Sequence, residues 1–150
     1  MHAFDLKPRT TISAVPFSPG SPGKLPSRSI LLLQERGRLK GHSPISRYLC
    51  SLPAARQPIP SIKLLTHTSG IPNYISSPEI ARLDRTGATP RQMSDLVADK
   101  PLDFPPGTNW SASNTGYILL GMIVEKISGQ SYADIRKTNI FAPLGMPESG

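Results

Sequence analysis

Hydrophobic and polar positions follow a different pattern in the first 29 residues than in the rest of the chain. Residues 1–29 show neither the three- and four-residue spacing of a helix nor the alternation of a strand, and they are rich in proline and serine. From Ile30 onward, short apolar runs alternate with turn residues, which indicates helices joined by turns. We therefore predict an atypical, basic Pro/Ser-rich N-terminal segment, 1–29, followed by a folded region, 30–150.

The first two expected helices are short, and glycines follow both of them. Ile30–Arg36 is an apolar run followed by Gly37, which suits the left-handed position after a helix end. Ser61 is expected to cap a second helix that ends at Gly70.

Three further helices each begin at a polar side chain that can accept a hydrogen bond from the backbone of the first turn. The longest has apolar residues at three- and four-residue steps and ends at Gly129. Such helices need a sheet to cover them, yet convincing strand patterns are hard to find, so we expect an α+β domain that lacks most of its sheet. The starting signals are Thr89 with Pro90 and Gln92, Ser113 or Asn114, and Ser131 with Asp134; the apolar positions of the longest helix are Tyr117, Leu120, Val124 and Ile127.

The net charge of +7 belongs to the first part of the chain. Residues 1–60 contain 9 Lys and Arg against 2 Asp and Glu, whereas residues 61–150 are balanced at 8 against 8. A basic, Pro-rich arm can bind phosphates, but no nucleic-acid motif or interleaved aromatic residue accompanies it. We therefore expect no nucleic-acid partner.

The sequence shows no signal for export or membrane insertion, and it has one cysteine. Residues 1–20 lack the continuous apolar core of a signal peptide. No stretch approaches the ~18 apolar residues of a membrane-spanning helix, so we expect no transmembrane segment. The single Cys50 rules out an internal disulfide, and its position suggests a packed residue or a chance replacement rather than a reactive thiol. The compartment is left open.

Two stretches of the folded region carry a family signature. They are Leu64–Tyr74, LLTHTSGIPNY, and Phe104–Gly121, FPPGTNWSASNTGYILLG. Their order and spacing resemble the serine β-lactamase-related hydrolases: class C β-lactamases, low-molecular-weight penicillin-binding proteins and esterases of the same fold. The resemblance implies an α+β, β-lactamase/transpeptidase-like fold (the DD-peptidase fold). A whole domain of that family is roughly twice this length or more, so the resemblance implies a partial domain: mostly the helical part, with the late sheet strands missing.

Ser21 and Lys24 stand where the family's first catalytic motif has its nucleophile and its lysine, with Phe17 and Gly20 ahead of them as in the family. Residues three apart at a helix N-terminus share one face and can touch. By resemblance, Ser21 would attack a carbonyl carbon to form an acyl-enzyme, and Lys24, its pKa lowered by burial, would act as the base.

The residues around this pair are unusual for a helix. If Ser21 capped a helix, Pro26 would lie one turn further in and would cost about 3 kcal/mol by removing a backbone bond. Gly23 adds about 1 kcal/mol relative to alanine. An out-of-frame read across part of 13–29 is one hypothesis that explains this composition.

The second motif departs from the family at one position. The family has Tyr-x-Asn, in which the tyrosine hydroxyl relays a proton to the leaving group, but this chain has Ala112 in place of the tyrosine. Asn114 is retained, and it either holds a substrate amide, as its family counterpart does, or caps the following helix. By resemblance, His67 is structural and supports the loop beside the cleft. The aromatic residues expected to pack rather than to bind substrate are Tyr74, Trp110 and Tyr117.

Two functions are compatible with these residues. The first is a serine hydrolase that forms an acyl-enzyme with an amide, lactam or ester carbonyl of a small-molecule or peptide substrate. The alternative is a catalytically inactive truncated fragment or pseudoenzyme, because the second motif is altered and the family's third motif is absent. We expect no cofactor and no metal, since no further ligands cluster with His2 or His42. The oligomeric state is left open.

Overall fold

The computed structural model describes residues 24–80, 88–143 and 145. In this part of the chain the backbone forms helices and turns without a strand, and one isolated antiparallel bridge joins Pro44 to Pro60. Most of the predicted Pro/Ser-rich segment, 1–29, lies outside the described residues.

The helices are short except at two places, and the turns between them contain single helical turns. The α-helices are α1 (Lys24–Glu35), α2 (Ser61–Leu65), α4 (Pro90–Asp95), α5 (Asn114–Ser128) and α6 (Tyr132–Arg136); the short turns are η2 (Ile45–Arg47), η3 (Ala54–Arg56), η4 (Tyr74–Ser76) and the π-helical turn η5 (Lys137–Phe141).

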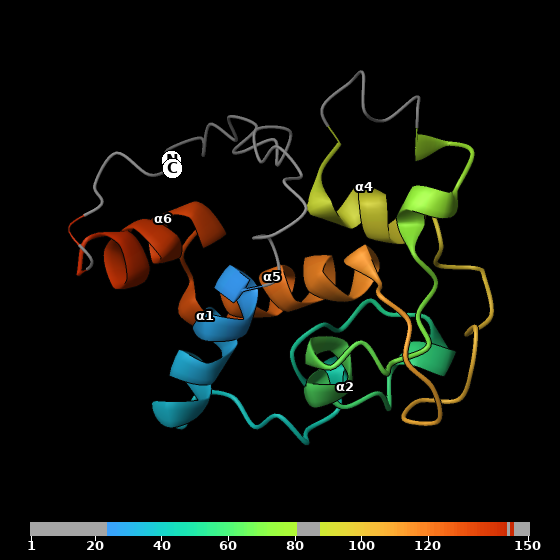
Figure 1. The fold of residues 1–150 in the computed structure, drawn as a ribbon, viewed down its shortest axis with the longest axis horizontal. Coiled ribbons are helices and arrows are strands. Elements are labelled where there is room, and N and C mark those ends of the chain that lie inside the picture. Colours follow the sequence, from blue (N-terminus) through green and yellow to red (C-terminus); the bar gives the residue numbers. More distant parts are fainter. Residues whose placement is uncertain (1–23, 81–87, 144, 146–150) are drawn as a thin grey trace, which may run out of the picture.

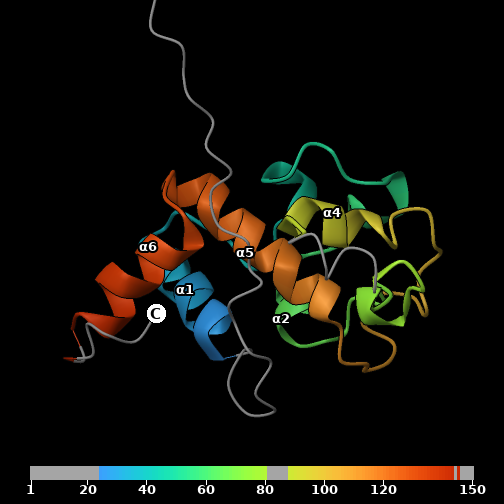
Figure 2. The same cartoon turned by 90° about the horizontal axis from the view of Figure 1, so that it is seen from above.

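Helix α5 is the centre of the molecule. Figures 1 and 2 show it running between α1 and α6 on one side and α2 and α4 on the other, and all four helices contact it. The predicted apolar face included Leu120 and Val124, which are fully buried, but Leu119 and Ile123 are equally buried. Because neighbours cover α5 from two sides, its buried surface is wider than one amphipathic stripe. The buried core comprises Ile30, Leu33, Leu39, Ile45, Ile59, Leu64, Ile71, Leu119, Leu120, Ile123, Val124 and Ile135.

Most of the predicted helix ends are confirmed. Gly37 follows α1 in the left-handed conformation, and the N–H of Arg38 reaches back to the carbonyl of Leu33 at 2.9 Å, as in a Schellman motif. Gly129 ends α5 in the same conformation, and Ser131 caps α6 by accepting from the Asp134 N–H.

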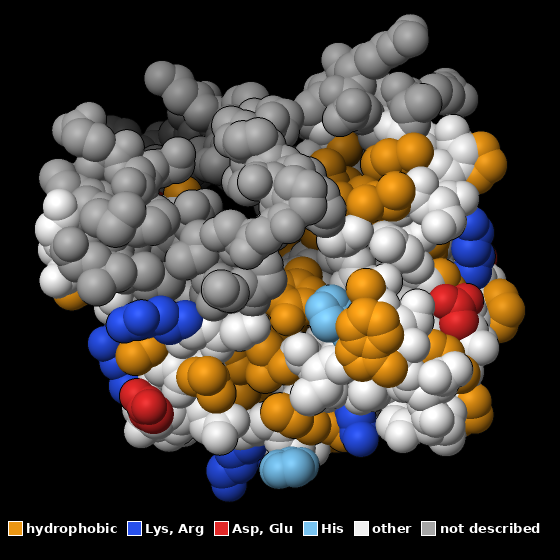
Figure 3. Space-filling model, in the orientation of Figure 1, with side chains coloured by type: hydrophobic (Ala, Val, Ile, Leu, Met, Phe, Trp, Pro, Cys, Tyr) orange, Lys and Arg blue, Asp and Glu red, His pale blue; other side chains and the backbone are white. Residues whose placement is uncertain are grey.

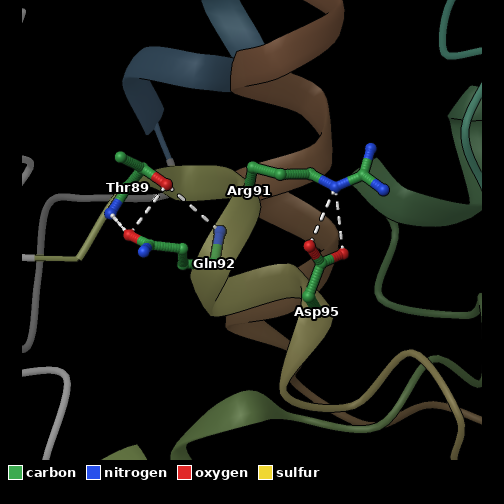
Figure 4. Close-up of polar contacts among 4 residues, drawn as sticks. All are labelled: Thr89, Arg91, Gln92 and Asp95. Carbon is green, nitrogen blue, oxygen red and sulfur yellow. Dashed lines mark hydrogen bonds and ion pairs between the residues drawn. The ribbon is translucent and has the colours of Figure 1, made fainter.

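Helix α4 begins with the expected capping box. The Thr89 hydroxyl accepts from the Gln92 N–H at 3.2 Å, and the Gln92 side chain accepts from the Thr89 N–H at 2.9 Å (Figure 4). Pro90 occupies the first helical position, where a missing N–H has no cost.

Three predicted helix boundaries are wrong. Helix α1 begins at Lys24 rather than Ile30, so Pro26 lies in its first turn, where no intrahelical bond exists for proline to remove. Helix α2 follows Pro60, and Ser61 is its first residue; the Ser61 hydroxyl donates to the Ser43 carbonyl at 3.4 Å instead of capping. This helix ends at Leu65 and not at Gly70.

Two single-residue expectations also fail. Cys50 is exposed, which rules out its interpretation as a packed residue, and Trp110, which was expected to pack, is 63% exposed. Arg56, in contrast, is buried, and its Nη2 donates to the Val97 carbonyl at the end of α4. Burial lowers the pKa of the Arg56 guanidinium, and the nearby carboxylates of Asp95 and Asp99 oppose that shift.

The described surface is mixed in character. Hydrophobic side chains reach it over the middle of the face shown in Figure 3, and Lys and Arg side chains are scattered around the edge. Among the helices of residues 24–80 and 88–143, none combines the length and the apolar character that a membrane crossing requires.

Candidate functional site

The two segments that carry the family signature lie side by side, although residues 75–103 separate them in the sequence. Three backbone hydrogen bonds join the first segment to the second and to Asp103, the residue just before it. The Asp103 N–H donates to the Gly70 carbonyl at 2.8 Å, the Gly107 N–H to the Thr68 carbonyl at 2.7 Å, and the Ser111 N–H to the His67 carbonyl at 3.0 Å. These bonds fix the path of the loop that leads into α5.

The first turn of α5 extends the same contact through buried side chains. Thr115 is fully buried; its hydroxyl donates to the Pro72 carbonyl at 2.7 Å and accepts from the Tyr74 N–H at 2.9 Å. Tyr117 is partly buried and donates its hydroxyl to the Leu65 carbonyl at 3.2 Å. Tyr117 is therefore a packing aromatic, as expected.

His67 is the residue at which the two segments meet most closely. Its Nδ1 accepts a hydrogen bond from the Ser113 N–H at 3.2 Å. Its ring lies 4.8 Å from the Tyr117 ring and 5.9 Å, edge-on, from the Trp110 ring. Burial lowers the pKa of His67 below its ordinary value of 6.5, which favours the neutral imidazole. These contacts give His67 the structural role that the resemblance implied.

Ala112, the altered position of the second motif, is exposed just before α5. It lies between Ser111 and Ser113, and the N–H groups of both neighbours are bound to His67. The Ser113 side chain caps α5 by accepting from the Gly116 N–H at 3.4 Å, so its hydroxyl faces the helix rather than position 112. The Ser113 hydroxyl therefore does not replace the one that the family has at position 112.

Asn114 is the first residue of α5, and the alternative interpretation as a helix cap is wrong because Ser113 fills that role. The Asn114 side-chain amide donates to Asn73 Oδ1 at 3.4 Å. Asn73 Oδ1 also accepts from the Ile75 N–H at 3.3 Å, which fixes the orientation of the Asn73 amide. Because the side-chain NH₂ group of the partly exposed Asn114 is directed at Asn73, its side-chain oxygen, Oδ1, is left for another partner.

Sequence reasoning missed Asn73 and Thr115. An Asn side chain often accepts a hydrogen bond from the backbone N–H two residues later in a turn. This local signal could have identified the turn at Asn73, which binds the Ile75 N–H. The role of Thr115 had no local signal, because both of its partners lie in another segment of the chain.

The first catalytic pair is only partly visible. Ser21 lies outside the described residues, and Lys24 is the first residue of α1, with its side chain also outside them. One turn later, the Ser27 hydroxyl lies 3.4 Å from the Tyr117 hydroxyl. The beginning of α1 therefore lies beside the first turns of α5, which carries Asn114. In the described ranges, no three His, Cys, Asp or Glu residues come together in a way that could hold a metal ion.

The chain matches known proteins over most of its length. The family model described as Beta-lactamase matches residues 29–150. Penicillin-binding protein 4* of Bacillus subtilis (strain 168) is 39% identical over 122 residues, which cover 80% of this chain and 27% of that protein. The chain spans about a quarter to a third of the length of the curated relatives that it matches.

Solved structures give the same result. The D-stereospecific amidohydrolase from Streptomyces sp. matches with a TM-score of 0.74 at 28% identity, over 81% of this chain and 39% of that one. The penicillin binding protein from Bacillus halodurans matches with a TM-score of 0.73 at 30% identity, over 85% of this chain and 41% of that one.

Proposed function

Because the chain belongs to the β-lactamase family, we propose that it carries part of the catalytic apparatus of a serine hydrolase that acts by acyl transfer. Its fold is the α+β, β-lactamase/transpeptidase-like fold, of which the described residues form helices. The proposed substrate is a small molecule or peptide with an amide, lactam or ester carbonyl. The fold alone does not choose among these three.

In the proposed reaction, the Ser21 hydroxyl oxygen attacks the carbonyl carbon while Lys24 accepts the hydroxyl proton. The leaving nitrogen or oxygen then departs with a proton, and water hydrolyses the resulting acyl-enzyme. Asn114 would hold an amide of the substrate through the carbonyl oxygen that its contact with Asn73 leaves available. The boundary between segments 1–29 and 30–150 stays a prediction.

The observation that carries this proposal is the meeting of two helix N-termini. Lys24 opens α1 and Asn114 opens α5, and the bond between Ser27 and Tyr117 ties the two openings together. A base and a substrate-holding amide must lie near one another to act on one bound carbonyl. This arrangement supports the roles assigned to Lys24 and Asn114.

A second candidate function is an inactive relative of these hydrolases. The observation that favours it is Ala112, which is exposed and carries no hydroxyl to relay a proton, while the neighbouring Ser113 hydroxyl caps α5. The two candidates share a fold and differ in turnover, so an activity measurement separates them.

The 150-residue chain should hydrolyse neither a chromogenic lactam nor a short-chain p-nitrophenyl ester above background, because Ala112 lacks the relay hydroxyl. The Ser21→Ala variant serves as the control in both assays. Turnover that disappears in this variant would establish a working nucleophile and reject the inactive relative. A downstream reading frame with a Lys- or His-Thr-Gly motif, in a longer form that is acylated at Ser21, would support the hydrolase.

A further inference from the structure

We propose that His67 is a positioning residue for residues 111–113, and with them for position 112: its backbone carbonyl holds Ser111 in either charge state, and its imidazole holds Ser113 only in the neutral form. Its carbonyl oxygen binds the N–H of Ser111, and its imidazole Nδ1 binds the N–H of Ser113. The consequence for acyl transfer rests on the proposed function, whereas the two hydrogen bonds do not.

The two hydrogen bonds hold the backbone on both sides of Ala112. The Ser111 N–H lies 3.0 Å from the His67 carbonyl oxygen, and the Ser113 N–H lies 3.2 Å from Nδ1. His67, which supplies both acceptors, has a left-handed backbone, with φ of 56°. A non-glycine residue in that conformation is uncommon and points to a specific local requirement.

The acceptor role determines the tautomer of the imidazole. A neutral imidazole has one N–H donor and one acceptor nitrogen, so a ring that accepts at Nδ1 has its proton on Nε2. An imidazolium has donors at both nitrogens and no acceptor. Protonation would therefore direct an N–H of the ring toward the N–H of Ser113 and break the bond, while the backbone bond to Ser111 would remain.

The surroundings of the ring keep it in place and disfavour its charge. Tyr117 lies against the ring, and the Tyr117 hydroxyl is itself bound to the Leu65 carbonyl. The loop from Phe104 to Ser113 contains no ionisable side chain. Helix α2 contributes a cation, Lys63, whose Nζ lies next to Gly107 of the same loop.

Three substitutions at His67 separate the acceptor from the ring. In His67→Asn, the side-chain oxygen falls near the place of Nδ1, cannot titrate, and suits a residue with positive φ. In His67→Gln, the amide falls near the place of Nε2 and cannot replace the acceptor. His67→Ala removes the ring altogether, and His42→Asn is the matched control at an exposed histidine.

The first measurement is the rate of amide hydrogen exchange at Ser111 and Ser113. NMR monitors this exchange on the full chain near neutral pH. Loss of the acceptor in His67→Ala and His67→Gln should speed exchange at Ser113 by about 2- to 12-fold, which corresponds to one ordinary hydrogen bond. Exchange at Ser111 should change much less, because its acceptor is a backbone carbonyl. His67→Asn should retain protection at Ser113.

The second measurement uses Trp110, which is the only tryptophan in the chain and lies edge-on to His67. A protonated imidazole beside an indole quenches its fluorescence, so the emission should fall in one step as the pH drops below 6.5. The step should persist in His42→Asn and be absent in His67→Asn. This comparison remains available even where His67→Ala fails to fold.

Unchanged exchange at Ser113 in both His67→Ala and His67→Gln would overturn the proposal, as would a fluorescence step that survives in His67→Asn. Neither measurement depends on turnover. A chain without hydrolase activity can therefore support this inference, and an active one can refute it.

Discussion

Ala112 is exposed, and its side chain lacks the hydroxyl that the family's proton relay requires. We predict that Ala112→Tyr will speed acylation by about 10²- to 10⁴-fold in a longer form that contains the rest of the family's domain. The backbone should accept tyrosine, because Ala112 faces solvent and His67 holds both neighbouring residues. The rate of labelling by a fluorescent penicillin measures the effect.

The gain from tyrosine should depend on Lys24, because the two groups would act as one proton relay. The Lys24→Ala variant is therefore the control background, in which Ala112→Tyr should give no gain. A gain that survives there would mean that the tyrosine acts differently. If Ala112→Tyr leaves the acylation rate unchanged while Lys24 is retained, the region around Ser21, rather than Ala112, prevents acylation.

Gly70 is constrained both by its conformation and by its neighbour. Its φ is 73°, and a Cβ at this position would collide with the Phe104 carbonyl oxygen. Gly37 has a similar φ of 68° but nothing within 4 Å of an added Cβ. We predict that Gly70→Ala will lower the free energy of unfolding by about 1–3 kcal/mol more than Gly37→Ala does. Urea unfolding of the two variants measures the difference, and equal losses would disprove the close approach.

Among the elements, α4 has the most complete local start signal. Thr89→Ala removes one half of its capping box and should lower the free energy of unfolding by about 1 kcal/mol. The control on the same helix is Arg91→Ala, which removes the ion pair between Arg91 and Asp95 at 3.0 Å (Figure 4). Both of these side chains are 49% exposed, so the control should cost at most about 0.5 kcal/mol. Thermal or urea unfolding that ranks the two variants the other way would reject the capping argument.

Helix ends were predictable where their interactions are local. Thr89, Gly37 and Gly129 each bind residues within a few positions, so the sequence contains the whole signal. Ser61 was misassigned because its hydroxyl binds Ser43, which belongs to a distant turn. The start of α1 was placed too late because an apolar pattern begins only at Ile30, where the helix becomes buried.

At the scale of the whole molecule, family resemblance located both motif segments, but it gave no pairing between them. The contacts of Thr115 with Pro72 and Tyr74 join residues more than 40 positions apart, and no periodicity encodes them. The same holds for the bond between Asn114 and Asn73. The sequence therefore indicated individual candidates such as Ala112 and Asn114, but it missed Asn73, Thr115 and the geometry, because tertiary packing around α5 creates that geometry.

Packing around His67 also links the stability of the whole molecule to pH. Burial lowers the pKa of folded His67 below the 6.5 of the unfolded chain, so the unfolded state binds more protons between the two values. The stabilising contribution of neutral His67 is therefore fully present above pH 6.5 and is lost as the pH falls through the folded pKa. We predict that the free energy of unfolding of the native chain will decline over this window relative to that of His67→Asn. Urea unfolding of both proteins, from about pH 7.5 to about pH 5, measures the difference and cancels the carboxylates that titrate in both. His42→Asn should follow the native chain, and a constant difference between the native chain and His67→Asn would show that His67 has the same pKa folded and unfolded.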